Sequence, residues 1–234
     1  MPSDDGTDPM EGATMAKVTK VCSEGRNRPV FICDFSPPRG ADPTLLGGAS
    51  FLNTDFVSVA YSPGKAVRVD SAIAAYTIKQ NGTENVIFTI STRDMNKLAI
   101  QNHLLGASLL GLDNVIVLMG DTFTEGDPVT VKNVSDFTSS ELISAVKSMN
   151  QGVDYRGLKL RSHTDFCVGA TIDLGKGINS EAKLAYRKNL AGADFFISQP
   201  LYDLTYLEEF QKSYKYLSGE EFPEPLFLGL QVLH

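Results

Sequence analysis

Short apolar segments alternate with segments of helical periodicity along almost the whole chain. Seven segments are apolar and rich in β-branched and aromatic residues, and turn-forming residues bound them: 30–36, 56–61, 85–92, 114–120, 166–172, 194–199 and 226–233. They lack strict alternation of apolar and polar residues, which is typical of strands buried on both faces of a parallel sheet. The sequence therefore predicts an α/β protein with parallel strands joined by right-handed crossovers.

Helix signals occupy the segments between these strands. Apolar residues recur at helical spacing over residues 94–110, and Gly111 is suited to end that helix. Two segments carry a capping-box pattern, a hydroxyl residue followed three positions later by Glu: Thr138 with Glu141, and Thr205 with Glu208. The first pattern predicts a helix to about Asn150, and the second predicts one that Gly219 ends.

Seven such units wind either into an open Rossmann-like sheet or into a (β/α)₈ barrel. A dinucleotide-binding open sheet carries G-x-G-x-x-G after its first strand, but residues 37–40 read Pro-Pro-Arg-Gly, and no Walker loop occurs. We therefore favour a TIM-type barrel. Such a barrel normally has about 250 residues and eight strands, so this chain of 234 residues predicts a barrel that is incomplete after the seventh strand.

The chain divides into a polar N-terminal tail, residues 1–28, and one barrel domain, residues 29–234. Residues 16–21 of the tail alternate in polarity, which is compatible with an extra strand or with a plug at the bottom of the barrel. If neither forms, the open edges of the first and seventh strands predict aggregation or association into homo- or hetero-oligomers.

Composition excludes several classes of partner. The net charge of −7 argues against nucleic acid, and no apolar run approaches the roughly twenty residues of a membrane span. Three cysteines without a C-x-x-C pair and three histidines away from the first six strand ends predict no metal site. The N-terminus resembles neither a signal nor a transit peptide, so we expect a cytoplasmic protein.

Polar residues gather at the C-terminal ends of the predicted strands, where parallel barrels carry their chemistry. These residues are Asp34, Tyr61, Ser62, Ser91, Thr92, Arg93, Asp121, Thr171 and Gln199. Asp34 interrupts a run that suits a core, so either a neighbour satisfies its carboxylate or it serves a ligand. Asp121 suits a ligand site or a structural turn, and Gln199 suits a flat heterocycle or the cap of a loop. The helical pair Arg187 and Lys188 suits a diphosphate or a solvated surface.

Read in order, these residues resemble the methylenetetrahydrofolate reductase family, especially the form fused to or partnered with methyltransferases in bacteria. The matching segments are 34–40, 56–61, 91–94 with Asn96 and Leu98, 105–107, Gly111, 114–115, 120–121, 126–127, Asn150 with Gly152, 191–195, 199–200 and 202–203. The resemblance covers about residues 30 to 233. It implies a (β/α)₈ barrel that binds FAD and reduces 5,10-methylenetetrahydrofolate to 5-methyltetrahydrofolate by hydride transfer from the flavin.

The resemblance also implies roles for individual residues. Asp34 stands where the family usually has a glutamate that protonates the folate during ring opening. Asp121 matches the aspartate beside the flavin and the pterin, and Gln199 matches the glutamine that contacts the folate. The implied FAD-binding positions are Tyr61, Thr89, Gly120, Asp121, Thr171, Glu181, Arg187 and Lys188, of which Glu181, Arg187 and Lys188 would hold the ribose and phosphates.

Three residues depart from the family pattern. Asp34 is one methylene shorter than glutamate, Thr89 stands where many members have histidine, and Thr171 stands where a tyrosine can face the flavin. The expected activity is that of an NAD(P)H-type methylenetetrahydrofolate reductase, an oxidoreductase of one-carbon metabolism and methionine biosynthesis, with NAD(P)H or a partner protein as electron donor. The alternative is a folate-binding or partner subunit of a methyltransferase or reductase complex without competent flavin chemistry, which the departures favour.

Overall fold

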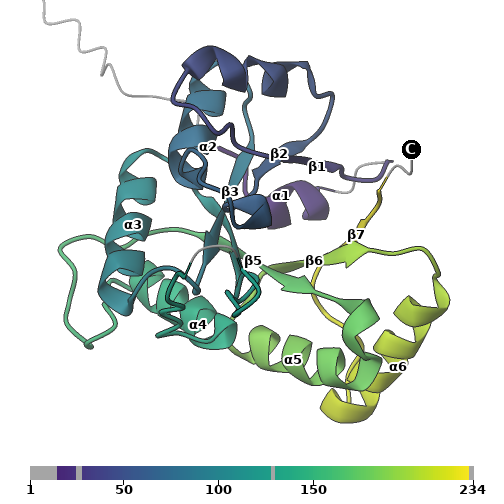
Figure 1. Ribbon diagram of the computed structural model, residues 1–234. Helices are drawn as coiled ribbons and strands as arrows, with labels where there is room; N and C mark the ends of the chain where they lie inside the picture. Colours follow the sequence, from purple (N-terminus) through teal and green to yellow (C-terminus); the bar gives the residue numbers. More distant parts are fainter. Residues whose placement is uncertain (1–14, 25–27, 128–129, 232–234) are drawn as a thin grey trace, which may run out of the picture.

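Seven parallel strands form one curved sheet in the computed structural model, which describes residues 15–24, 28–127 and 130–231 (Figure 1). The strands are β1 (Ile32–Phe35), β2 (Phe56–Val59), β3 (Val86–Ser91), β4 (Asn114–Leu118), β5 (Cys167–Ile172), β6 (Phe195–Pro200) and β7 (Leu226–Gly229). Each strand pairs in parallel with the next one in the chain. The prediction of seven parallel strands is confirmed, and residues 232–233 of the last predicted strand lie outside the described residues.

Helices follow one another around the outside of these strands (Figure 1). They are α2 (Ser71–Gln80), α3 (Lys97–Leu109), α4 (Ser139–Asn150), α5 (Ile178–Leu190) and α6 (Thr205–Ser218), with three 3₁₀ segments, η1 (Pro43–Phe51), η2 (Pro63–Lys65) and η3 (Leu174–Lys176). The alternation of strand and helix bends the sheet into a nearly closed barrel of the TIM type, without an eighth strand among the described residues. No described helix has the length and apolar character needed to cross a bilayer.

Local sequence signals fix the start of α4 and the end of α6, as predicted. The predicted capping box of α4 is present, because Thr138 Oγ1 accepts from the Glu141 N–H and the Glu141 carboxylate accepts from the Thr138 N–H. Gly219 ends α6 with a φ of 80°, a conformation that glycine adopts without strain.

Two helix starts differ from the prediction. The helix expected from residue 94 begins at Lys97, because the Asn96 side chain accepts from the Ala99 N–H and so acts as the N-cap. The capping box expected at the start of α6 is absent, because the N–H of Thr205 instead donates to the side chain of Asp203.

The N-terminal half of the barrel interior is apolar. Phe56, Ile87, Ile116, Cys167 and Phe195 meet there in one buried cluster. Gly169 makes this packing fit, because a Cβ at that position would lie only 2.4 Å from the Phe195 ring. The bottom of the barrel is therefore a packed core, and any ligand site must lie toward the other end.

Helix α1 (Val18–Ser23) plugs the bottom of the barrel. Its Val18 and Val21 side chains are buried in the apolar cluster of the barrel interior. Asn114, at the start of β4, accepts from the Val18 N–H and donates to the Ala16 carbonyl, both at 3.0 Å. Of the two forms weighed for residues 16–21, the plug is therefore present and the extra strand is not.

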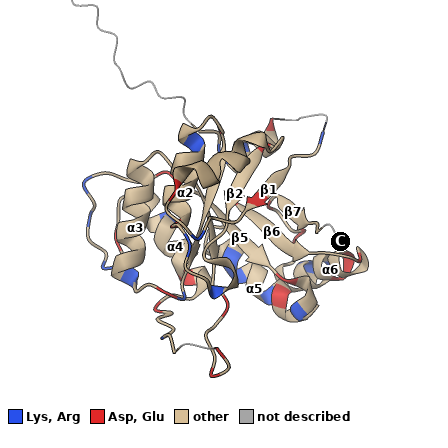
Figure 2. Cartoon of the chain, turned by 45° about the horizontal axis from the view of Figure 1, so that its top comes forward, with Lys and Arg blue, Asp and Glu red and all other residues tan. Residues whose placement is uncertain are grey.

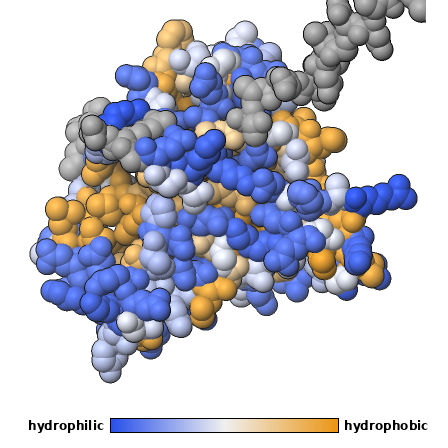
Figure 3. Space-filling model, turned by 180° about the vertical axis from the view of Figure 1, so that it is seen from behind, coloured by the Kyte–Doolittle hydropathy of each residue, from blue (hydrophilic) through white to orange (hydrophobic). Residues whose placement is uncertain are grey.

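A seam separates the two end strands of the sheet. β1 pairs only with β2 and β7 only with β6 among the described strands, and both lie on the same side of the molecule (Figure 1). Exposed apolar side chains border the seam, including Phe31 and Leu230. Figure 3 shows an apolar area on this side of the molecule. The barrel interior is consequently open along its flank as well as at its top.

Candidate functional site

A cavity of about 880 Å³ occupies the upper part of the barrel and extends along the seam between β1 and β7. Five strands or their ends contribute polar side chains to its wall: Asp34, Ser58, Tyr61, Thr89, Thr171 and Gln199. Ile32, Leu118, Ile197 and Phe227 supply apolar surface between them. The cavity is thus a pocket with apolar walls and a few polar groups near the strand ends, as small-molecule sites usually are.

Asp34 and Gln199 both line this cavity, as the sequence predicted for residues that end β1 and β6. Although Asp34 interrupts an apolar run, its side chain is exposed and not buried in a core. The reason is that β1 is an edge strand, and no described segment covers the seam beside it. Gln199 is exposed as well, so both side chains are free to face a ligand.

Tyr61 forms the rim of the cavity at the end of β2. Burial raises the pKa of its hydroxyl, and the nearby Asp94 carboxylate, which accepts a hydrogen bond from that hydroxyl, raises it further. Tyr61 is therefore a neutral hydrogen-bonding group at physiological pH.

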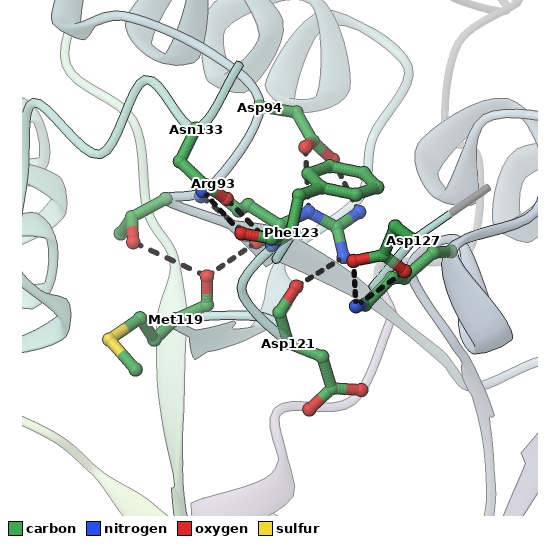
Figure 4. A network of polar contacts seen from close by, with 10 residues as sticks. Arg93, Asp94, Met119, Asp121, Phe123, Asp127 and Asn133 are labelled. Atoms are coloured by element: carbon green, nitrogen blue, oxygen red, sulfur yellow. Dashed lines mark hydrogen bonds and ion pairs between the residues drawn. The ribbon is translucent and has the colours of Figure 1, made fainter. Parts of the chain in front are cut away.

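Arg93 connects the ends of β3 and β4 beside the cavity (Figure 4). Its guanidinium makes a two-point ion pair with Asp94, with both N···O distances 2.7 Å, and donates to the Asp121 carbonyl at 3.0 Å. The Phe123 ring covers it, with the guanidinium carbon 4.5 Å from the ring centroid. Arg93 is only 5% exposed, and these contacts replace the water that its guanidinium group would otherwise bind.

Asp121 does not line the cavity, although it follows the C-terminal end of β4. Its side chain is exposed and points away from the Arg93 network in Figure 4. The preceding Gly120 has a φ of 81°, and a Cβ there would lie 2.4 Å from Ser91 Oγ. Gly120 thus packs closely against β3, and Asp121 lies outside the cavity wall that carries Asp34 and Gln199.

Sequence reasoning missed the residues that fasten the loop after β4. Lys65 of η2 forms an ion pair with Asp127 at 2.9 Å, and the Asn133 side chain bonds both the N–H and the carbonyl of Phe123. Hydrogen bonds to Lys65 and to Thr124 lower the pKa of the Asp127 carboxyl. The loop has no periodicity, so only the Gly126–Asp127 segment of the resemblance gave a signal there.

The three residues expected to hold the FAD ribose and phosphates lie on α5 and not on the cavity wall. Glu181 is 8% exposed and accepts from the Asp173 N–H, while Lys188 is 3% exposed and donates to the Thr171 carbonyl. Burial lowers the pKa of Lys188 to about 8. Arg187 is exposed on the outside of the helix. α5 packs on the outer face of the sheet, which keeps these side chains behind β5.

Of the remaining expected site residues, two line the cavity and one lies beside it. Thr89 and Thr171 line the cavity from β3 and β5, whereas Gly120 shapes the adjoining turn. The described part of the chain contains no cluster of His, Cys, Asp or Glu placed to hold a metal ion. Acidic and basic residues are interspersed over the described chain (Figure 2). The wall thus offers one carboxylate, one amide and several hydroxyls, a set suited to a polar heterocycle.

Comparison with solved structures supports the fold assignment. An uncharacterized protein from Clostridium thermocellum that binds two copies of 5-methyl-5,6,7,8-tetrahydrofolic acid aligns with a TM-score of 0.59 at 12% identity. The alignment covers 85% of this chain and 64% of that one, so the chain spans somewhat less than two thirds of that protein. A 2,3-dimethylmalate lyase of the PEP mutase/isocitrate lyase superfamily aligns with a TM-score of 0.54 at 16% identity, over 91% of this chain and 70% of its own.

The sequence comparisons identify the family. No curated protein sequence matched the chain. The profile of methylenetetrahydrofolate reductase matches residues 21–223, which is most of the chain and includes every strand except β7. The protein therefore belongs to the methylenetetrahydrofolate reductase family.

Proposed function

We propose that the protein binds a reduced folate, with the pterin ring in the barrel cavity. The observation that carries the proposal is the presence of Asp34 and Gln199 on one cavity wall, both exposed. A pterin presents an amino group and a ring N–H as donors beside a carbonyl acceptor. A carboxylate accepts two hydrogen bonds, and an amide both donates and accepts, so the pair complements that edge.

The family and the fold support a folate as the ligand. The chain belongs to a family named for its folate substrate. A protein with the same fold binds 5-methyl-5,6,7,8-tetrahydrofolic acid. The apolar wall residues Ile32, Leu118 and Ile197 provide surface for the faces of a flat ring. The folate's charged glutamate tail would remain in solvent, outside the cavity.

Family membership favours a second candidate, the flavin-dependent reduction of 5,10-methylenetetrahydrofolate. In that function FAD supplies the hydride, NAD(P)H or a partner protein reduces the flavin, and Asp34 delivers the proton to the folate. The exposed Asp34 carboxylate reaches the cavity, so its position suits either function.

Calorimetric titration of the purified chain with 5-methyltetrahydrofolate tests the proposal. Asp34→Asn should weaken binding about tenfold or more, because a hydrogen bond to a charged group contributes roughly 1.5–3 kcal/mol. Gln199→Leu should weaken binding about fivefold, as expected for a neutral hydrogen bond of about 1 kcal/mol. Glu125→Gln and Gln211→Leu, at exposed positions away from the cavity, serve as matched controls. Unchanged affinity in both cavity variants would place the folate elsewhere.

A further inference from the structure

The cavity wall continues beyond Asp34 along the end of β2. Ala60, Tyr61 and Pro63 line it there and present mostly apolar surface. Asp34 pairs with Ser58 in the sheet, so Tyr61 stands three residues farther toward the C-terminal ends of the strands. Three residues span at most about 10 Å. A two-ring ligand with one ring at the level of Asp34 can therefore place its second ring beside Tyr61.

The Tyr61 ring is fastened to the protein before any ligand arrives. Its hydroxyl donates to the Asp94 carboxylate, which also forms the two-point ion pair with Arg93. The Phe123 ring in turn covers the Arg93 guanidinium (Figure 4). Because the hydroxyl proton of Tyr61 is engaged, this side chain offers a ligand its ring surface. A ring that is already held in place loses little conformational entropy when a ligand binds to it.

The two openings of the cavity differ in charge. Exposed apolar side chains border the seam between β1 and β7. At the rim, by contrast, the Arg68 guanidinium donates to the Pro37 carbonyl at 2.7 Å and, more weakly, to the Pro63 carbonyl at 3.4 Å. Neither Arg68 nor the exposed Arg39 makes an ion pair with any described carboxylate. An anionic group that leaves the cavity is therefore better placed at the rim than at the seam.

We propose that this rim is the subsite for the p-aminobenzoylglutamate part of the folate. The p-aminobenzoyl ring lies against Tyr61 and Pro63, and the glutamate carboxylates lie in solvent outside the cavity, beside Arg68. A folate fits this arrangement because only one methylene and one nitrogen join its pterin to the second ring. The inference rests on the proposed function, since the pterin must first lie at Asp34 and Gln199. It adds which residues contact the rest of the ligand and by which opening the tail leaves.

Calorimetric titrations of the purified full-length chain test the ring contact. The two ligands are 5-methyltetrahydrofolate and 6-methyltetrahydropterin, which lacks the p-aminobenzoylglutamate part. Tyr61→Leu should weaken binding of the folate about threefold to tenfold and leave binding of the pterin unchanged, because only the folate has the second ring. Tyr61→Phe keeps the ring and should weaken folate binding less than Tyr61→Leu does. Tyr216→Leu, at an exposed position on α6, is the matched control and should change neither affinity.

Equal weakening of both ligands by Tyr61→Leu, or weakening of neither, would overturn the ring subsite. If the unsubstituted protein binds no 5-methyltetrahydrofolate, the proposed function fails and the subsite fails with it. Binding of the folate that is weakened by Asp34→Asn but not by Tyr61→Leu would uphold the proposed function and overturn only the subsite.

The salt dependence of folate binding tests the position of the carboxylates. Arg68→Gln removes the charge but keeps a donor for the main-chain carbonyls, so it should weaken folate binding about twofold to fivefold at low salt. The difference should disappear as the salt concentration rises, because salt screens exposed charges. Arg156→Gln, at an exposed position away from the cavity, is the matched control. A change that is independent of salt, or equal to that of the control, would overturn the placement of the carboxylates beside Arg68.

Discussion

The buried amine of Lys188 makes the stability of the protein depend on pH in the alkaline range. The side chain is 3% exposed, and burial lowers its pKa from the ordinary value of 10.5 to about 8. Glu181 opposes this shift, while Arg187 and Lys176 add to it. Between pH 8 and 10.5 the unfolded chain consequently binds more protons at this residue than the folded chain does. The free energy of unfolding must therefore rise with pH across this window.

The size of the effect follows from the two pKa values. A change from 10.5 to about 8 corresponds to roughly 3 kcal/mol, because each pKa unit is worth about 1.4 kcal/mol. Below pH 8 the folded protein bears this whole cost, since the amine is charged in both states. Lys188→Met removes the cost but leaves the Thr171 carbonyl without its donor, a loss of about 1–3 kcal/mol. At pH 7 the two proteins should therefore have similar stabilities.

Urea unfolding at intervals from pH 7 to 10.5 measures this behaviour. The free energy of unfolding of the unsubstituted protein, measured relative to that of Lys188→Met, should grow by about 3 kcal/mol over the range. The other titrating groups contribute equally to both proteins and do not affect this difference. Lys183→Met, at an exposed position on α5, should show no such trend relative to the unsubstituted protein. A difference between the Lys188→Met and unsubstituted proteins that stays constant with pH would refute the reasoning and indicate that water reaches the amine.

Two further substitutions test how the barrel bottom and the rim are built. Asn114→Ala should lower the free energy of unfolding by about 2 kcal/mol, because residues 16 and 18 lose their two hydrogen bonds to the Asn114 side chain, whereas Asn102→Ala on the exposed face of α3 should change little. Gly120→Ala should cost about 2 kcal/mol or more, because its φ is 81° and the new Cβ would collide with Ser91 Oγ; Gly48→Ala, where nothing lies within 4 Å, is the control. Urea unfolding measures both pairs, and equal stabilities within either pair would contradict the corresponding argument.

From the amino-acid sequence alone the architecture could be predicted, and so could a candidate site at the C-terminal ends of the strands. Its apolar runs predicted seven parallel strands because strands covered on both faces need apolar side chains on both faces. The capping box of α4 and the glycine that ends α6 could also be predicted, because each depends on residues only a few positions apart. Because the ends of parallel strands meet at one face, Asp34 and Gln199 could be expected on the same cavity wall.

Packing between distant parts of the chain sets which polar side chains reach the cavity and which contact other partners. Asp34 is exposed because the seam beside β1 is uncovered, Asp121 turns outward after Gly120, and Lys188 faces the back of β5. The helical plug α1 depends on Asn114, a residue about one hundred positions away. Such contacts join distant parts of the chain, so local patterns do not encode them. The direction of a side chain and the partner of a charge are set by the packing of neighbouring elements.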